Sequence, residues 1–230
     1  MTNAAKLQDL PAYTVADAAR YLRIPSGTLQ AWLHGRTYNT KDGQQFSAPL
    51  IQRPSAEFSQ LSFINLIEAH VLRVIRQDHN IRLDKVRTAL DYIEREFATP
   101  HPLASIDFQT DGVNLFVESV GRLINASENG QLAMRQTLNQ LLKRIEYDRQ
   151  VAIRLFPNLR PNQSDSPKLL VFDPAVSFGR LAIADTGIPT SIVTERYRAG
   201  DSIDLLAEDY GCTRLQIEEA IRYELPPQIA

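Results

Sequence analysis

The sequence predicts an α+β protein that is mainly helical and consists of three modules. Two pairs of short helices with clear start and stop signals, one near each end of the chain, predict two helix-turn-helix units. Between them, alternating apolar residues around glycine-containing turns predict β-hairpins. We therefore expect a winged helix-turn-helix head over residues 1–98, a small hairpin-containing middle module over 99–170, and a helical C-terminal domain over 171–230.

The composition is that of an ordinary water-soluble globular protein. The chain has 230 residues, of which 43% are hydrophobic and 23% charged. No apolar run is long enough to cross a bilayer, and the first residues lack the apolar stretch of a signal peptide. Cys212 is the single cysteine, which excludes an intrachain disulfide and a cysteine-rich zinc site. A cytoplasmic protein with no membrane partner is expected.

The net charge of −2 conceals an asymmetry between the two ends. Residues 1–60 carry six basic and four acidic side chains, whereas residues 173–230 carry five basic and ten acidic ones. A mildly basic segment suits the phosphates of a nucleic acid, and an acidic segment does not. The two ends are therefore expected to bind different partners.

The N-terminal segment shows the pattern of a helix-turn-helix. Thr14 is a good N-cap for a helix that ends at Leu22, and Asp17 completes a pair resembling a capping box. A second helix is expected from Pro25 or Ser26 to Gly35, with Trp32 on its apolar side. Polar side chains on or near the exposed side of this unit become the candidate DNA contacts: Thr14, Ser26, Thr28, Gln30, His34, Arg36 and Lys41.

A β-wing and two helices are expected to follow. The segment Thr37–Pro54 alternates around a Lys41-Asp42-Gly43 turn, as a hairpin should. Long helices are predicted to open at Leu61–Phe63 and at Ile81–Val86, each with one apolar stripe.

The head resembles that of the MerR family of regulators. The matching positions are those of the apolar and capping residues: Thr14, Val15, Ala18, Ala19, Leu29 and Trp32. This resemblance implies binding to operator DNA. The chain departs from the family after Phe97, where neither a long dimerisation helix nor a cysteine array follows. A homodimer is expected nonetheless, because helix-turn-helix heads usually bind paired half-sites.

The middle of the chain is predicted to combine hairpins with one helix. One hairpin is expected from 105–108 and 113–117 around Thr110-Asp111-Gly112, and a second from 122–125 and 131–134 around Asn129-Gly130. A helix over 135–148 and strands over 151–156 and 168–172 should follow, with a proline-rich connection at 157–167.

Three short helices are expected in the C-terminal domain. The first covers Thr190–Arg198, the second is capped by Asp201 or Ser202 and ends at Gly211, and the third is capped by Thr213. The second and third carry several carboxylates, which oppose phosphate binding: Glu208, Asp209, Glu218, Glu219 and Glu224. A protein partner is therefore favoured.

The segment that precedes these helices carries a family pattern. Asp173-Pro174, Gly179-Arg180 and Thr186–Pro189 resemble the family called domain of unknown function 433, although Asp185 replaces its usual glycine and Leu181 its usual proline. Such domains occur in VapBC-type antitoxins, whose toxin partner is a PIN-domain ribonuclease. The resemblance implies that basic side chains approach the acidic, magnesium-binding site of the toxin. The candidates are Arg180, Arg196, Arg198, Arg214 and Arg222.

No residue pattern indicates catalysis. The four histidines have no metal-binding spacing, and neither a phosphate loop nor a nucleophile elbow occurs. No enzyme activity, cofactor or metal is expected. Two functions remain open: an antitoxin that binds a PIN-domain ribonuclease and represses its own operon, or a stand-alone MerR-like transcription regulator that responds to a ligand or protein partner.

Overall fold

The computed structural model describes residues 7–41, 43–157 and 166–225, which form two compact units. The N-terminal unit contains the described residues up to Lys143 together with Tyr147–Ala152, and the C-terminal unit contains Arg144–Glu146 and the described residues from Ile153 onward. Both are described separately below. The α+β, mainly helical class is confirmed. No helix within the described ranges is long and apolar enough to cross a membrane.

The N-terminal unit begins with the predicted helix-turn-helix. After a 3₁₀ turn, η1 (Leu7–Asp9), come α1 (Val15–Leu22) and α2 (Ser26–His34). The Thr14 hydroxyl oxygen accepts a hydrogen bond from the Asp17 amide at 3.0 Å, which confirms the predicted cap of α1. Arg23 adopts a left-handed conformation with φ of 52°, so α1 ends there and the chain turns into α2.

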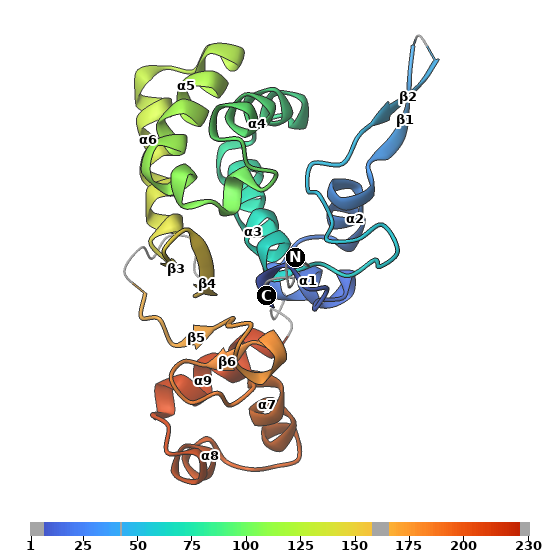
Figure 1. Cartoon of the computed structure of the whole chain (residues 1–230). Coiled ribbons are helices and arrows are strands. Elements are labelled where there is room, and N and C mark those ends of the chain that lie inside the picture. Colours follow the sequence, from blue (N-terminus) through green and yellow to red (C-terminus); the bar gives the residue numbers. More distant parts are fainter. Residues whose placement is uncertain (1–6, 42, 158–165, 226–230) are drawn as a thin grey trace, which may run out of the picture. The chain divides into compact units, whose positions relative to one another are not determined.

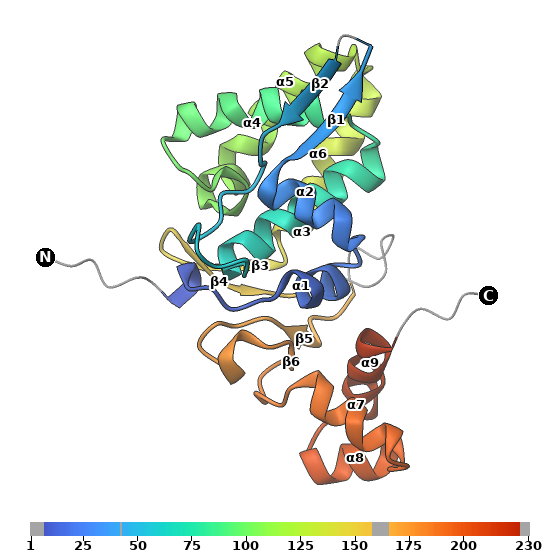
Figure 2. The same ribbon diagram turned by 90° about the vertical axis from the view of Figure 1, so that its right-hand side faces the viewer.

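The wing is also confirmed. Strands β1 (Arg36–Thr40) and β2 (Gly43–Ser47) pair antiparallel, with Arg36 opposite Ser47 and Thr40 opposite Gly43. The hairpin extends away from α2 in both ribbon views (Figures 1 and 2).

The central helix of the unit is α3 (Phe63–His79), which packs against α1 and α6. Twelve of its first thirteen residues are buried, Arg73 being the exception, and most of them are apolar, which makes this burial favourable. Ser62 and Asn65 form a reciprocal capping box at its start, with both hydrogen bonds at 3.2 Å. The next helix, α4 (Leu83–Phe97), buries Val86, Leu90 and Ile93 as its apolar stripe predicts.

The two hairpins predicted at 105–117 and 122–134 are wrong, because this region is helical. It consists of η2 (Pro102–Ala104), a π-helical turn η3 (Phe108–Gly112), α5 (Val113–Ile124) and α6 (Glu128–Leu142). The buried residues of α5 recur at helical spacing: Val113, Phe116, Val117 and Val120. Helical burial on one face therefore outweighs the local turn preference of the glycine dipeptides.

Both dipeptides have a helical role instead. A Cβ atom at Gly112 would lie 2.8 Å from the Phe108 side chain and 2.9 Å from that of Phe97, so this glycine permits close packing. Gly130 lies in the first turn of α6, where its amide donates to the N-cap Ser127 hydroxyl at 3.2 Å. The same short polar residues are favoured at helix starts and in turns, so these dipeptides alone do not distinguish a helix start from a hairpin.

A hairpin does form in this part of the chain, but it follows α6. Helix α6 ends at Leu142, so the helix predicted to reach residue 148 is wrong beyond that point. Strands β3 (Ile145–Asp148) and β4 (Val151–Leu155) form a hairpin there, and the strand expected over 151–156 is confirmed. Most of the proline-rich connection at 157–167 lies outside the described residues.

The C-terminal unit combines a small sheet with three helices. Strand β5 (Leu170–Val171) pairs antiparallel with β6 (Ala182–Ile183), and the loop between them contains the turn η4 (Ser177–Gly179). Helices α7 (Thr190–Arg198), α8 (Ile203–Tyr210) and α9 (Arg214–Glu224) follow, and α9 packs on both strands and on α7. Ser202 and Thr213 cap α8 and α9, as the sequence predicts.

Candidate nucleic-acid interface and C-terminal binding surface

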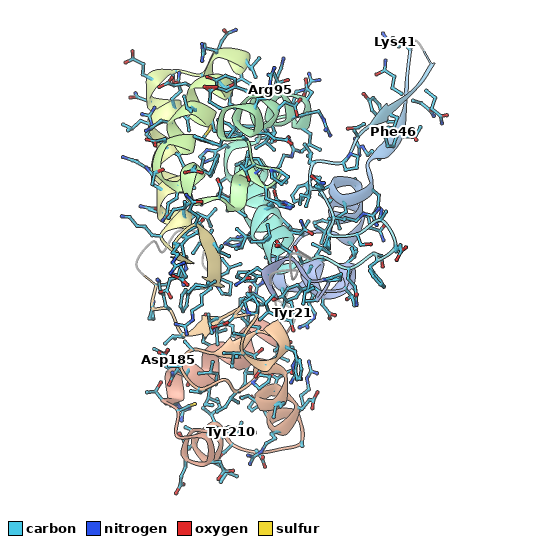
Figure 3. The ribbon with its side chains drawn as sticks, viewed as in Figure 1. Tyr21, Lys41, Phe46, Arg95, Asp185 and Tyr210 are labelled. Atoms are coloured by element: carbon cyan, nitrogen blue, oxygen red, sulfur yellow. The ribbon has the colours of Figure 1, made fainter. Side chains whose placement is uncertain are left out.

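All seven candidate DNA contacts are exposed in the N-terminal unit. Helix α2 supplies Ser26, Thr28, Gln30 and His34, while the wing supplies Arg36 and Lys41. Figure 3 shows Lys41 at the far end of the wing. Thr14 differs from the others, because its hydroxyl both caps α1 and donates to the Asp17 carboxylate at 2.7 Å.

A hollow of about 600 Å³ brings four of these residues together. Thr28, Gln30, His34 and Arg36 line it, whereas Thr14, Ser26 and Lys41 do not. Arg76 of α3 also lines the hollow, although no sequence signal marked it. Its guanidinium donates to the Ile81 carbonyl, so the position of this cation depends on how α3 and α4 pack.

The opposite side of α2 fixes the helix in the core. Leu29, Trp32 and Leu33 are at most 2% exposed. The Trp32 carbonyl also accepts hydrogen bonds from the Leu50 and Ile51 amides, at 2.8 and 3.1 Å. These contacts hold the segment after the wing against α2, which leaves the polar side of the helix facing solvent.

Gly35 sets the angle at which the wing leaves α2. Its φ of +75° belongs to the left-handed region, and an added Cβ would lie 2.5 Å from the Ser47 carbonyl oxygen and 2.6 Å from the Phe46 ring. Only glycine allows strand β2 to pass this close to the end of α2.

The surroundings of His34 favour its neutral form. Partial burial lowers the pKa of His34 below the ordinary value, and the nearby positive charge of Arg53 lowers it further. A neutral imidazole can donate one hydrogen bond and accept another, which suits the edge of a base.

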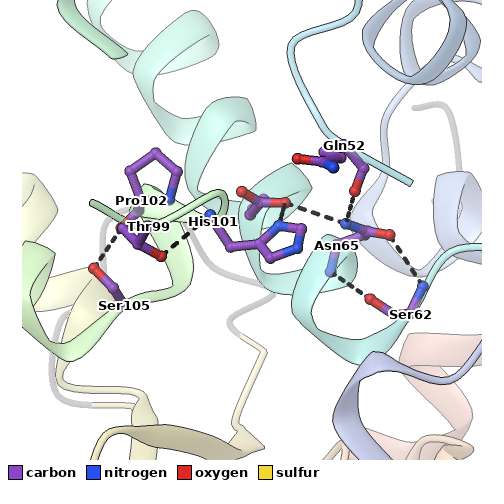
Figure 4. A network of polar contacts seen from close by, with 8 residues as sticks. Gln52, Ser62, Asn65, Thr99, His101, Pro102 and Ser105 are labelled. Carbon is purple, nitrogen blue, oxygen red and sulfur yellow. Dashed lines mark hydrogen bonds and ion pairs between the residues drawn. The ribbon is translucent and has the colours of Figure 1, made fainter. Parts of the chain in front are cut away.

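A buried polar network joins α3 to Gln52, in the segment that follows the wing (Figure 4). Asn65 Nδ2 donates to the Gln52 carbonyl at 2.8 Å and to Glu68 Oε2 at 3.2 Å, and His101 Nδ1 lies 3.1 Å from the same carboxylate oxygen. Burial raises the pKa of Glu68. Burial lowers that of His101, but its hydrogen bond to Glu68 and the charge of Glu68 raise it more, so the net shift is upward. The pattern of α3 gave no sign of this charge pair.

The segment that follows the wing also borders a second cavity, of about 580 Å³. Its lining includes Leu33 of α2, Glu68 of α3 and Arg87 of α4. Arg87 donates to the carbonyls of Ala48 and Pro49, directly after the wing. The wing thus connects to α3 and α4 through side-chain hydrogen bonds as well as through the chain.

Three of the five candidate toxin-binding arginines form ion pairs within the C-terminal unit. Arg196 contacts Asp201 and Asp209, both at 2.6 Å, and lies over the ring of Tyr210, which Figure 3 labels. Hydrogen bonds, that to Asp209 above all, raise the pKa of Arg196. Arg214 pairs with Asp204 and Glu218, and Arg222 with Glu219. Such exposed pairs are weak and exchangeable.

Arg180 and Arg198 differ from these three. Both are exposed, and neither pairs with a carboxylate among the residues that the structure describes. The Arg180 Nε group donates to the Ser177 carbonyl at 3.2 Å. These two cations are the ones available to a partner without loss of an internal ion pair.

Asp185 shows why its position in the family pattern is usually glycine. It has a φ of 63°, a left-handed conformation that aspartate tolerates better than most residues. In the described ranges, no group of three or more histidine, cysteine, aspartate or glutamate side chains could hold a metal ion.

Comparison with known proteins supports both ends of this description. Residues 170–223 match the family described as "Protein of unknown function (DUF433)", and residues 11–90 match that described as "Putative DNA-binding HTH domain". A curated relative from Mycobacterium tuberculosis strain H37Rv, named "Putative antitoxin VapB45", is 29% identical over an alignment of 237 positions, and the match covers 93% of this chain and 93% of that relative.

A solved structure shares the fold. The X-ray crystal structure of Rv2018 from Mycobacterium tuberculosis superposes with a TM-score of 0.66, covers 92% of this chain and 98% of that chain, and is 24% identical. The predicted resemblances to the DUF433 family and to a helix-turn-helix domain are thereby confirmed, as is the resemblance to an antitoxin. No comparison names the MerR family, so that likeness stays a prediction.

Proposed function

We propose that this protein is a non-catalytic antitoxin with two separate binding surfaces. The N-terminal unit binds operator DNA and represses the operon, and the C-terminal unit binds a PIN-domain ribonuclease and holds it inactive. The observation that carries the proposal is the pairing of an exposed polar α2 and wing with a DUF433 domain, in a chain that resembles a named antitoxin over 93% of its length.

The DNA-binding part follows from the shape of the head. An α-helix fits the major groove of B-DNA, where Thr28, Gln30 and His34 would meet base edges. Arg36 and Lys41, at the two ends of β1, would contact phosphates and hold the helix in register. Arg76 would add a phosphate contact beside the hollow.

The toxin-binding part follows from charge. The acidic surface of the C-terminal unit repels phosphate, so DNA is a poor partner for it. Its five exposed or partly exposed arginines would approach the acidic site of the ribonuclease, with Arg180 and Arg198 able to pair without first breaking an internal ion pair.

The test uses the protein encoded beside this gene, which the proposal requires to be a PIN-domain ribonuclease. Purified full-length protein should form a stable complex with that ribonuclease and suppress RNA cleavage in a stoichiometric titration. It should also retard a DNA fragment from upstream of the operon. Cleavage that continues at a molar excess of this protein would reject the antitoxin function.

The second candidate is a stand-alone regulator whose N-terminal unit responds to a small ligand. The cavity beside Arg87 and Glu68 favours it, because both side chains belong to hydrogen-bonded groups that reach the segment after the wing. Deletion of the adjacent gene distinguishes the two functions. Repression that needs no PIN-domain protein and changes with a metabolite would support the regulator.

A further inference from the structure

Phe178 is the most exposed large apolar side chain in the described part of the chain. Its exposed fraction is 91%, compared with 64% for Phe46, the next in order. It lies in the turn η4, which we call the Phe178 turn (Ser177–Gly179). Water solvates an aromatic ring poorly, and the ring adds nothing to the core of its own unit. Folding therefore does not explain why phenylalanine occupies this position.

The backbone of the turn makes phenylalanine still less favourable there. Ser177, Phe178 and Gly179 have φ angles of 49°, 58° and 75°, so three successive residues lie in the left-handed region. Only glycine enters this region without steric cost. Outliers of this kind persist where the surrounding structure enforces them, and they gather at binding sites.

The surrounding structure does enforce this conformation. The Ser177 hydroxyl donates to the Gly187 carbonyl at 2.6 Å, and the Gly179 amide donates to the Val176 carbonyl at 2.9 Å. The Ala175 amide donates to Asp173 Oδ1 at 2.9 Å, which fixes the approach to the turn. Because Gly179 is buried while Phe178 is exposed, the ring projects from a fixed base.

The charged residue nearest to Phe178 along the chain is basic. Arg180 follows the turn directly, and its amide and its Nε group both donate to the Ser177 carbonyl at 3.2 Å. Its side chain is exposed and meets no carboxylate among the described residues. An exposed aromatic ring and a guanidinium carried by the same turn complement an apolar pocket with carboxylates at its edge.

We propose that Phe178 is the anchor by which the C-terminal unit holds the ribonuclease. The ring enters an apolar pocket on the toxin, and Arg180 pairs with a carboxylate at the edge of that pocket. Rigid aromatic side chains are frequent binding hot spots, and a preformed turn loses little conformational entropy when it binds. This inference rests on the proposed antitoxin function and names the contact that performs it.

The experiment measures the affinity of the full-length protein for the purified adjacent PIN-domain protein by calorimetry. Phe178→Ala and Phe178→Gly should each weaken binding by about 30-fold or more, as loss of a hot spot does. Phe178→Tyr should bind within a few-fold of wild type. Leu215→Ala, which removes another exposed apolar side chain of the same unit, is the matched control and should bind like wild type.

Thermal unfolding of the free protein separates an anchor from a structural residue. Phe178→Gly should raise the unfolding midpoint, because glycine relieves the left-handed strain at φ of 58°, even though it weakens binding. Arg180→Glu should also weaken binding, and the affinity of the wild type should fall with salt.

Two results would overturn the inference while the proposed function stands. In one, wild type binds the toxin and Phe178→Ala binds within about twofold of it, below the effect of a hot spot. In the other, Phe178→Gly lowers the unfolding midpoint in parallel with the affinity. If wild type does not bind the toxin at all, the proposed function and this inference both fail.

Discussion

Two exposed cations, Arg36 and Lys41, flank strand β1 of the wing at its two ends. If both contact phosphates, Arg36→Ala and Lys41→Ala should each weaken operator binding without unfolding the chain. Each lost contact should lower the slope of log K against log salt by roughly one unit. Arg95→Ala, an exposed position on α4, is the control and should leave the slope unchanged. Unaltered slopes in both wing variants would show that DNA binds elsewhere.

The Glu68–His101 pair predicts how stability depends on pH. Folding raises both pKa values, so the folded state holds protons more tightly than the unfolded state. Glu68 makes stability fall as pH rises above its ordinary value of 4.5, and the contribution of His101 is complete below 6.5 and lost as pH rises through its raised pKa.

Chemical unfolding between pH 4.5 and 8 checks this sign. Glu68→Gln should flatten the dependence, because the glutamine does not titrate and no longer raises the pKa of His101. Glu96→Gln, which is exposed on α4 and outside the network, should keep the wild-type profile. A Glu68→Gln variant that keeps the wild-type pH profile would contradict the assignment.

At this scale the sequence predicted which side chains are exposed better than it predicted buried contacts. Thr28, Gln30 and His34 could be placed on the exposed side because they fall on the polar side of a helix whose ends and apolar residues are clear. Glu68 could not, because its contact is with His101, 33 positions further along the chain. Arg76 could not either, because it faces the hollow only through the way in which the turn at Ile81 packs against α3. No local pattern encodes such contacts.

At the scale of elements, the connection between α2 and the wing depends on a single residue, Gly35. Gly35→Ala should displace the wing and weaken operator binding by about tenfold or more, since a φ of +75° and a contact of 2.5 Å to the Ser47 carbonyl both exclude a Cβ. Gly130→Ala is the matched control in the same unit, because this glycine is helical and its added Cβ would meet only the Ser127 hydroxyl, at 3.4 Å. Equal operator affinities for the two variants would mean that the wing angle is unimportant.

Elements with capping signals were predicted closely, and those in the middle of the chain were not. Thr14, Ser202 and Thr213 mark their helices because a side-chain cap is a local interaction. The Asp111-Gly112 and Asn129-Gly130 dipeptides favoured hairpins, but burial of Phe116 and Val120 on one helical face decides the outcome. The helical spacing of these apolar residues was the sequence signal for a helix, and it outweighs the turn preference of the dipeptides.

At the scale of the whole molecule, the proposal requires two copies of the chain on DNA. One α2 and one wing offer few base contacts, and paired half-sites about one helical turn apart supply the remainder. Light scattering after size-exclusion chromatography should give twice the chain mass of 25.9 kDa at micromolar concentration, with and without operator. A mass of one chain under both conditions would exclude the homodimer.

The division into modules over residues 1–98, 99–170 and 171–230 stays a prediction. The two ends match their own family patterns, at residues 11–90 and 170–223, and the charge asymmetry favours different partners for them. The C-terminal unit also includes Arg144, whose guanidinium donates to the Phe156 carbonyl at 2.8 Å and the Ser166 carbonyl at 2.9 Å. These two hydrogen bonds join residues that are 12 and 22 positions apart, and the composition of a segment does not indicate such long-range contacts.

The central claim is that one chain binds DNA with its N-terminal unit and silences a ribonuclease with its C-terminal unit. The most direct measurement is RNA cleavage by the adjacent PIN-domain protein, titrated with wild type, with an Arg36→Ala/Lys41→Ala double variant and with Phe178→Ala. We expect complete inhibition by wild type and by the wing variant at equimolar amounts. Phe178→Ala should inhibit weakly but still bind operator DNA like wild type. Full ribonuclease activity in the presence of excess wild type would contradict the central claim.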